Sequence, residues 1–246
     1  MGAVVKDLSI VLPCFNEQES IPVMIPRLTN ALEAMKRQNQ VQNYEIIVVN
    51  DSSTDQSLSL LESFTQVRVV QNEGPRGYGR ALKRGFSKAT GDWICFLDMD
   101  NTYRPEDLPL FLSEISQSDS DFIIGTRALS EKGMSFVRGL GNWAYMSLAS
   151  IIYGSKLRDV CSGYRVFHRR HLDEILTIPE EGLDFSIHLT LKMITKNVTI
   201  HQIAIGYDER LGESKLSVLS DGWAFLMVIL NLKLRRLRAL KHSRVR

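Results

Sequence analysis

The stretch Trp93-Ile94-Cys95-Phe96-Leu97-Asp98-Met99-Asp100 is an apolar run that ends in two acidic residues one position apart. Its length and its polar flanks are typical of a buried strand in a parallel or mixed sheet. Open α/β sheets bind ligands at the carboxyl ends of their strands, where two carboxylates suit a divalent cation and a diphosphate. Asp98 and Asp100 are equally residues that end strands and cap helices, so the pair alone leaves both interpretations open.

Further apolar runs and the helical spacing between them predict a parallel sheet built from βαβ units. The expected strands cover residues 8–12, 44–49, 67–70, 93–97, 122–124 and 198–206, and helices are expected at about 17–38, after 51–55, and at 139–153 and 184–195. The fold class is therefore α/β, with a mostly parallel sheet flanked by helices. We expect one domain over residues 1–218 and a C-terminal helix within 219–246.

Polar groups also follow the first two strands. Pro13-Cys-Phe15-Asn16-Glu17 places an aromatic ring and polar side chains where a base and a ribose can lie, and Asn50-Asp51-Ser-Ser-Thr-Asp55 repeats the pattern. Helix capping by Asn16 or by the second segment explains each one alone. Because three strand ends deliver such groups to one edge of the sheet, a nucleotide site is the better explanation.

Composition and missing motifs exclude several classes of function. The net charge of +2 over 246 residues is too small to indicate nucleic acid as a partner. Gly74-Pro-Arg-Gly77-Tyr-Gly79 lacks the third glycine of a dinucleotide fingerprint, so a nicotinamide site is excluded. The three cysteines are widely spaced, which indicates neither disulfides nor a metal knuckle and suits a reducing, cytoplasmic compartment. We expect no secretion signal, because the first residues contain no long apolar run.

Three later segments place Arg or Lys beside Gly or Ser. They are residues 125–127, 159–165 and 208–215. This combination suits phosphate, because guanidinium groups and exposed backbone N–H groups donate to its oxygens. Solvated surface charge is the simpler explanation for any one of these segments taken alone.

Seven motifs follow one another along the chain: Leu-Pro-Cys-Phe-Asn-Glu (12–17), Val-Val-Asn-Asp-Ser-Ser-Thr-Asp (48–55), Gly-Asp (91–92), Leu-Asp-Met-Asp (97–100), Gly-Thr-Arg (125–127), Ser-Gly-Tyr-Arg (162–165) and Arg-Leu-Gly-Glu-Ser-Lys-Leu-Ser (210–217). In this order they resemble the inverting family 2 glycosyltransferases, and most of all the dolichyl-phosphate mannose synthase-like branch. The resemblance covers residues 7 to 218. It implies the GT-A nucleotide-sugar fold, a GDP- or UDP-sugar donor, Mg²⁺ or Mn²⁺, and a polyprenyl phosphate acceptor.

The resemblance also implies roles for single residues. Those implied for the donor nucleotide sugar are Pro13, Phe15, Glu17, Val49, Asp51, Asp98, Met99, Arg210 and Lys215. Asp98 and Asp100 would bind the metal, and Asp100, Arg127 and Arg138 would be catalytic, with both arginines facing the acceptor phosphate. The Gln/Arg-x-x-Arg-Trp motif of the processive synthases is absent, which indicates transfer of a single sugar.

The acceptor leaves two further interpretations open. A phosphate monoester is already ionised near neutral pH, so it needs positioning rather than a general base. A glycan hydroxyl would instead need a base, for which Asp184 is the candidate, although Asp184 is equally suited to cap the following helix. A non-catalytic module that binds nucleotide sugars is the alternative from a different class.

The C-terminal segment predicts an amphipathic helix over residues 223–240. Trp223, Leu226, Leu230, Leu234 and Leu237 recur at helical steps, and Lys and Arg occupy its other faces. Such a helix lies on a membrane surface, and its apolar run is far shorter than the roughly 20 residues needed to cross one. Packing on the protein's own core or on a partner subunit is the alternative. We therefore expect a peripheral enzyme at the cytoplasmic face of a membrane, with an integral membrane protein as a further possible partner.

Overall fold

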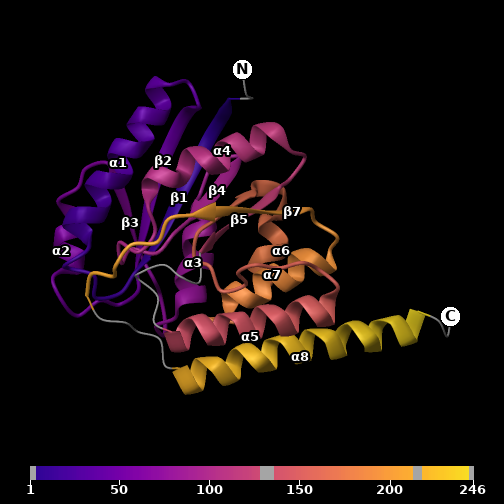
Figure 1. Cartoon of the computed structure of the whole chain (residues 1–246). Coiled ribbons are helices and arrows are strands. Elements are labelled where there is room, and N and C mark those ends of the chain that lie inside the picture. Colours follow the sequence, from indigo (N-terminus) through magenta and orange to yellow (C-terminus); the bar gives the residue numbers. More distant parts are fainter. Residues whose placement is uncertain (1–3, 128–135, 213–217, 244–246) are drawn as a thin grey trace.

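The computed structural model describes residues 4–127, 136–212 and 218–243 (Figure 1). Its strands are β1 (Val5–Cys14), β2 (Val41–Asn50), β3 (Val67–Gln71), β4 (Trp93–Phe96), β5 (Phe122–Arg127), β6 (Arg165–His168) and β7 (Ile200–Ile205). Its α-helices are α1 (Ile21–Arg37), α2 (Ser57–Glu62), α3 (Tyr78–Phe86), α4 (Leu108–Gln117), α5 (Phe136–Tyr153), α6 (Leu172–Leu176), α7 (Phe185–Thr195) and α8 (Val218–Ser243). Two short 3₁₀ helices, η1 (Pro105–Asp107) and η2 (Arg169–His171), precede α4 and α6.

The strands form one seven-stranded sheet in the order β3-β2-β1-β4-β6-β5-β7. Among these described strands, only β6 runs against its neighbours, since it pairs antiparallel with both β4 and β5. The predicted α/β class and mostly parallel sheet are thus confirmed. The sequence did not reveal β6, because four residues that begin with an arginine are too short for an apolar period.

Helices cover both faces of the sheet. Along β1, Leu8, Ile10 and Leu12 pack with α1 and α4, whereas Val11 packs with α3 and belongs to the cluster that also includes α6 and α7. Successive strand side chains point to opposite faces, so a strand that is apolar throughout must be covered on both sides. Figure 1 shows this arrangement of a central sheet between two helical layers.

The helix predicted at residues 223–240 is present as the longer α8. Phe225, Val228 and Ile229 pack it against α5 and α7, and in Figure 1 it lies side by side with α5 and projects beyond the rest of the molecule. Trp223 is nevertheless 66% exposed and Leu234 51% exposed. Packing on the protein's own core therefore accounts for one face of α8 and leaves another apolar face uncovered.

No helix in the described ranges combines the length and apolar character needed to span a bilayer.

Candidate active site

The parallel register brings the predicted polar strand ends together. Pro13 lies beside Val49 and Cys14 beside Asn50, and the backbone N–H of Leu97 donates to the carbonyl of Val11 at 3.3 Å. The segments that follow β1, β2 and β4 consequently meet at one edge of the sheet, as predicted. This edge is where open α/β sheets bind ligands.

The two acidic residues after β4 are held by different partners. Asp98 Oδ1 accepts a hydrogen bond from the Tyr78 hydroxyl at 2.8 Å. Asp100 Oδ1 accepts from the backbone N–H of Thr102 at 3.0 Å and from its hydroxyl at 2.5 Å, while Asp100 Oδ2 forms an ion pair with Arg210. Neither carboxylate stands at the cap of the helical segments that follow. The capping interpretation of this pair is therefore wrong.

The electrostatics of the pair suit a divalent cation. Burial, and then the negative charge of Asp100, raise the pKa of Asp98 to about 7 despite the opposing effects of Tyr78 and Arg210. A metal ion would relieve this repulsion, and carboxylate oxygens are ligands that Mg²⁺ and Mn²⁺ prefer. Within the described residues no group of three or more His, Cys, Asp or Glu side chains is arranged to hold a metal. Mg²⁺ usually binds one or two protein carboxylates and takes its other ligands from water and substrate phosphates.

Asp51 ties the loop before α3 to the end of β2. The residue is 4% exposed, and its carboxylate accepts hydrogen bonds from the Asn72 side chain at 2.5 Å and from the Gly77 backbone N–H at 2.9 Å. Asn16 likewise does not cap α1, since it adopts a φ of 51° and accepts a hydrogen bond from Thr54 at 2.8 Å. Asp51 and Asn16 thus do not cap helices. Asp51 connects the end of β2 to the loop before α3, and Asn16 connects the loop after β1 to the loop after β2.

The other residues predicted to bind the donor differ in accessibility. Pro13 and Phe15 are partly exposed, and the guanidinium of Arg76 lies 4.2 Å from the centre of the Phe15 ring. Val49 and Met99 are at most 1% exposed, so neither residue is accessible to solvent. The carboxylate of Glu17 accepts a hydrogen bond from Ser20 at 2.9 Å, which fixes it at the start of α1.

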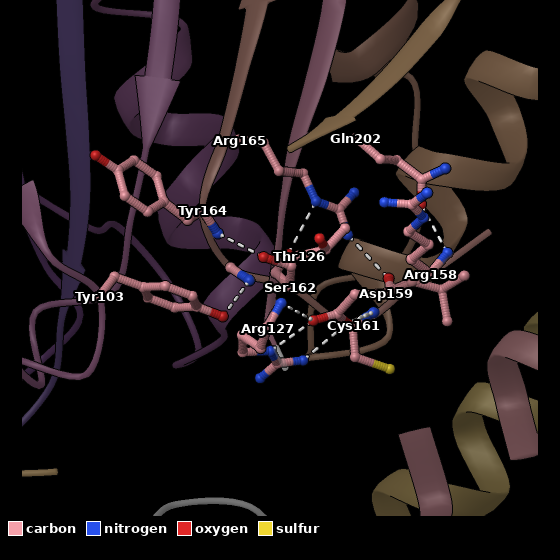
Figure 2. A network of polar contacts seen from close by, with 12 residues as sticks. Tyr103, Thr126, Arg127, Arg158, Asp159, Cys161, Ser162, Tyr164, Arg165 and Gln202 are labelled. Carbon is pink, nitrogen blue, oxygen red and sulfur yellow. Dashed lines mark hydrogen bonds and ion pairs between the residues drawn. The ribbon is translucent and has the colours of Figure 1, made fainter. Parts of the chain in front are cut away.

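The predicted acceptor-side arginines are only partly described. Arg127 makes a two-point ion pair with Asp159, with Nε–Oδ2 at 2.6 Å and Nη2–Oδ1 at 2.9 Å (Figure 2). Asp159 is fully buried, and the side chain of Arg127 is 12% exposed. Arg138 belongs to α5, but its side chain lies outside the described residues, as does the whole of Lys215.

Arg165 is not available to a phosphate, contrary to the interpretation of residues 159–165. It is fully buried and donates to the carbonyls of Val160, Ser162 and Ser186 and to the hydroxyl of Thr190, at 2.8–2.9 Å. These bonds satisfy a cation that has lost its water, although burial still lowers the pKa of Arg165. The residue holds this loop against α7.

The loop after β7 carries Arg210 to the acidic pair. The backbone N–H of Asp208 donates to Thr102 at 2.8 Å, and that of Leu211 donates to Asp100 at 3.1 Å. Arg27 of α1 secures the same loop through Asp208 at 3.3 Å. Sequence reasoning missed this connection and the Tyr78 contact, because the partners are far apart in the chain and no local pattern links them.

Asp184 stands at the N-cap position of α7 but makes no capping hydrogen bond with its side chain. Burial, and then the charge of Glu180, raise its pKa. Asp184 therefore occupies the predicted cap position of α7 without the side-chain hydrogen bond of a cap, and its carboxyl group has a raised pKa.

Curated relatives are similar over most of this chain. It is 31% identical over 227 residues to the low-salt glycan biosynthesis hexosyltransferase Agl6 of Haloferax volcanii, covering 91% of this chain and 53% of the relative. It is 30% identical over 225 residues to the undecaprenyl-phosphate 4-deoxy-4-formamido-L-arabinose transferase of Yersinia enterocolitica, covering 87% and 64%. It is 26% identical over 223 residues to the dolichol-phosphate mannosyltransferase of Pyrococcus furiosus, covering 85% and 59%. The chain therefore spans less than two thirds of the length of these relatives.

Solved structures share the fold. Glucosyl-3-phosphoglycerate synthase from Mycobacterium tuberculosis, in complex with Mn²⁺, UDP and phosphoglyceric acid, gives a TM-score of 0.69 at 21% identity, covering 92% of this chain and 78% of that one. The same enzyme with Mg²⁺ and UDP gives 0.67 at 20% identity, covering 91% and 78%. This likeness confirms the predicted GT-A-type fold. The family model described as glycosyl transferase family 2 matches residues 9–176, and the chain belongs to that family.

Proposed function

We propose that this protein transfers a single sugar, with inversion, from a nucleotide diphosphate sugar to a polyprenyl phosphate, using Mg²⁺ or Mn²⁺. The observation that carries the proposal is the acidic pair Asp98 and Asp100 at the strand ends, with Arg210 brought against it by the loop after β7. Two relatives, named as undecaprenyl-phosphate and dolichol-phosphate transferases, support the acceptor class. The donor is a GDP- or UDP-sugar.

The chemistry needs positive charge at the departing diphosphate. As the glycosidic bond breaks, negative charge grows on the leaving group, and fixed cations stabilise it in the transition state. A bound metal held by Asp98 and Asp100 would act as a Lewis acid at the diphosphate oxygens. Arg210 would donate to the same diphosphate, since its guanidinium already lies against Asp100. Asp51, Phe15 and Pro13 would bind the nucleoside.

The acceptor phosphate would be positioned by cations. It is ionised near neutral pH, so no base has to remove a proton from it. In this proposal Arg127 faces the phosphate, and Asp159 fixes the orientation of its guanidinium. Arg138 and Lys215 are assigned to the acceptor and the donor, respectively, on the resemblance of their motifs alone.

The test is incorporation of label into an organic-extractable lipid. Purified protein is incubated with Mn²⁺, polyprenyl phosphate and a panel of labelled GDP- and UDP-sugars. Label from one donor, abolished by EDTA, is the expected result and names the sugar. Nucleotide release without lipid label contradicts a lipid acceptor, and the absence of any turnover supports a non-catalytic binding module.

A hydroxyl acceptor is the second candidate, because Asp184 carries a raised pKa at the start of α7. A carboxyl of raised pKa is a suitable general base for an alcohol. Under this alternative, Asp184→Asn abolishes turnover while UDP or GDP binding is unchanged. Full lipid transfer by Asp184→Asn excludes it.

Membrane binding through α8 is part of the proposal. Its uncovered face carries Trp223, Leu230 and Leu234, and Ile151 of the adjacent α5 is 81% exposed. An apolar stripe on a basic helix suits the interface of an anionic bilayer. The free cysteines suit the cytoplasmic side.

The double variant Trp223→Ala/Leu234→Ala should bind anionic vesicles about ten-fold or more weakly than the wild type. The reason is that full burial of a large apolar side chain contributes about 1.5–3 kcal/mol of favourable free energy. Co-sedimentation with phosphatidylglycerol vesicles measures this. Leu110→Ala, which removes an exposed leucine on α4 (47% exposed), is the matched control. Equal vesicle binding by the wild type, the double variant and Leu110→Ala would show that α8 is not the membrane contact. Binding of the wild type to vesicles of pure lipid would show that it needs no integral membrane partner to reach the membrane.

A further inference from the structure

We infer that Gly163 is a positioning residue that sets the orientation of the Asp98 carboxylate toward the metal. This inference rests on the proposed function, since Asp98 matters here as a metal ligand. Gly163 lies in the loop between Asp159 and β6, and it is distant from Asp98 in the sequence. Its contribution is the absence of a side chain.

The space beside Gly163 is filled by Asp98. A Cβ atom added at Gly163 would lie 2.7 Å from Oδ2 and 2.8 Å from Oδ1 of Asp98, where 3.4–4 Å is ordinary contact. The φ angle of Gly163 lies outside the left-handed region, so its backbone conformation does not itself require glycine. The close approach of the Asp98 carboxylate is what requires glycine at this position.

The loop cannot easily retreat from Asp98. The backbone N–H of Gly163 donates to the hydroxyl of Tyr103 at 2.7 Å, and Tyr103 is 1% exposed. Arg165 holds the carbonyls of Val160 and Ser162, both at 2.9 Å. Figure 2 shows Tyr103 and Arg165 both reaching toward this loop. The buried Arg127–Asp159 ion pair fixes its other end, and the Asp159 carboxylate also accepts from the backbone N–H of Cys161 at 3.1 Å.

The carboxylate is restrained on a second side as well. Tyr78 donates its hydroxyl to Oδ1 of Asp98 at 2.8 Å. A methyl group at position 163 must therefore turn the carboxylate against the Tyr78 hydrogen bond or displace a loop that is anchored at both ends. The anchors oppose displacement of the loop, so the carboxylate turns and a metal ligand is misplaced. Partners that orient a metal ligand typically change metal affinity by about 10–100-fold when they are mutated.

The experiment measures Mn²⁺ affinity directly, without turnover. Free Mn²⁺ is followed by EPR during titration of the wild type, Gly163→Ala and Cys161→Ala, with and without UDP. Cys161→Ala is the matched control, because it changes a side chain of the same loop that packs toward the α5–α7–α8 cluster. We expect Gly163→Ala to stay folded and to bind Mn²⁺ about ten-fold or more weakly, and Cys161→Ala to bind like the wild type.

The results for Gly163→Ala and for the wild type test the positioning role and the proposed function separately. Wild-type affinity in Gly163→Ala overturns the positioning role, whereas a wild type that binds no Mn²⁺ at all contradicts the proposed function instead. If Gly163→Ala does not fold, Tyr103→Phe takes its place, because it removes the hydroxyl that holds the Gly163 N–H. Weaker Mn²⁺ binding by Tyr103→Phe supports the inference, and unchanged binding overturns it.

Discussion

Asp100→Ala should lower sugar transfer by about two to three orders of magnitude while leaving the protein folded. The substitution removes one of two carboxylates proposed to hold the metal, and fixed charge at a developing oxyanion is worth about 10²–10³-fold for a single donor. The fold should tolerate the change. Arg210 is 27% exposed and can turn to solvent, and Thr102 keeps its own backbone bond to Asp208.

Transfer and Mn²⁺ affinity are measured on the same preparations. Asp119→Ala, which removes an exposed carboxylate shortly after the end of α4, is the matched control and should behave like the wild type. Full lipid glycosylation by Asp100→Ala would refute the metal role of the acidic pair. Loss of transfer with unchanged Mn²⁺ affinity would assign Asp100 to the orientation of Arg210 instead.

Asp159→Asn should destabilise the protein by about 3–5 kcal/mol, because it leaves the buried guanidinium of Arg127 without a counter-charge. Asn preserves the shape of the side chain, so the lost charge and not a cavity accounts for the effect. Asp159 is fully buried, and Arg127 is 12% exposed, so solvent provides little compensation. Urea denaturation followed by circular dichroism measures the free energy of unfolding.

The Arg127–Asp159 ion pair also makes the stability of the protein depend on pH, and the sign of this dependence can be predicted. Burial by itself raises the pKa of Asp159, but the charge and hydrogen bonds of Arg127 outweigh it and lower the pKa below its ordinary value. A carboxyl with a lowered folded pKa contributes full stability above its unfolded pKa, about 3.9, and loses it as the pH falls through the folded value. The difference in stability between the wild type and Asp159→Asn should therefore be constant near neutral pH and shrink below about pH 4. A difference that grows on acidification would contradict this assignment.

A double variant separates the structural and catalytic roles of Arg127. Arg127→Met/Asp159→Leu replaces the ion pair by apolar side chains, which is often neutral or stabilising where breaking the pair is not. We expect it to regain most of the stability that Asp159→Asn loses. If its lipid transfer stays low while nucleotide binding is normal, Arg127 serves the acceptor. Recovery of transfer would make the pair purely structural.

The family is indicated by the order of seven motifs, which resembles the family 2 glycosyltransferases. The sequence by itself also determined the fold class and the edge of the sheet that carries the proposed site. These features follow from local patterns: apolar runs such as Trp93–Phe96 become strands, and parallel strands place the residues after them at one edge. The acidic pair, Asp51 and Phe15 could be located in this way because each directly follows a strand. The amphipathic α8 could be located from its period of 3.6 residues.

Only the tertiary structure decided which charged side chains are buried or paired and which remain accessible to a ligand. Arg127 and Arg165 both end short segments that contain Gly and Ser or Thr, so they look alike in the sequence. Arg127 is nevertheless paired with the buried Asp159, whereas Arg165 is fully buried and donates to backbone carbonyls and to the Thr190 hydroxyl. The contacts of Asp98 with Tyr78 and Gly163 likewise join segments that are distant in the chain. The physical reason is that the burial and the ion pairing of a side chain depend on which helices and strands pack around it. Here that packing follows from the position of β6, which lies antiparallel between β4 and β5. No local period encodes that packing.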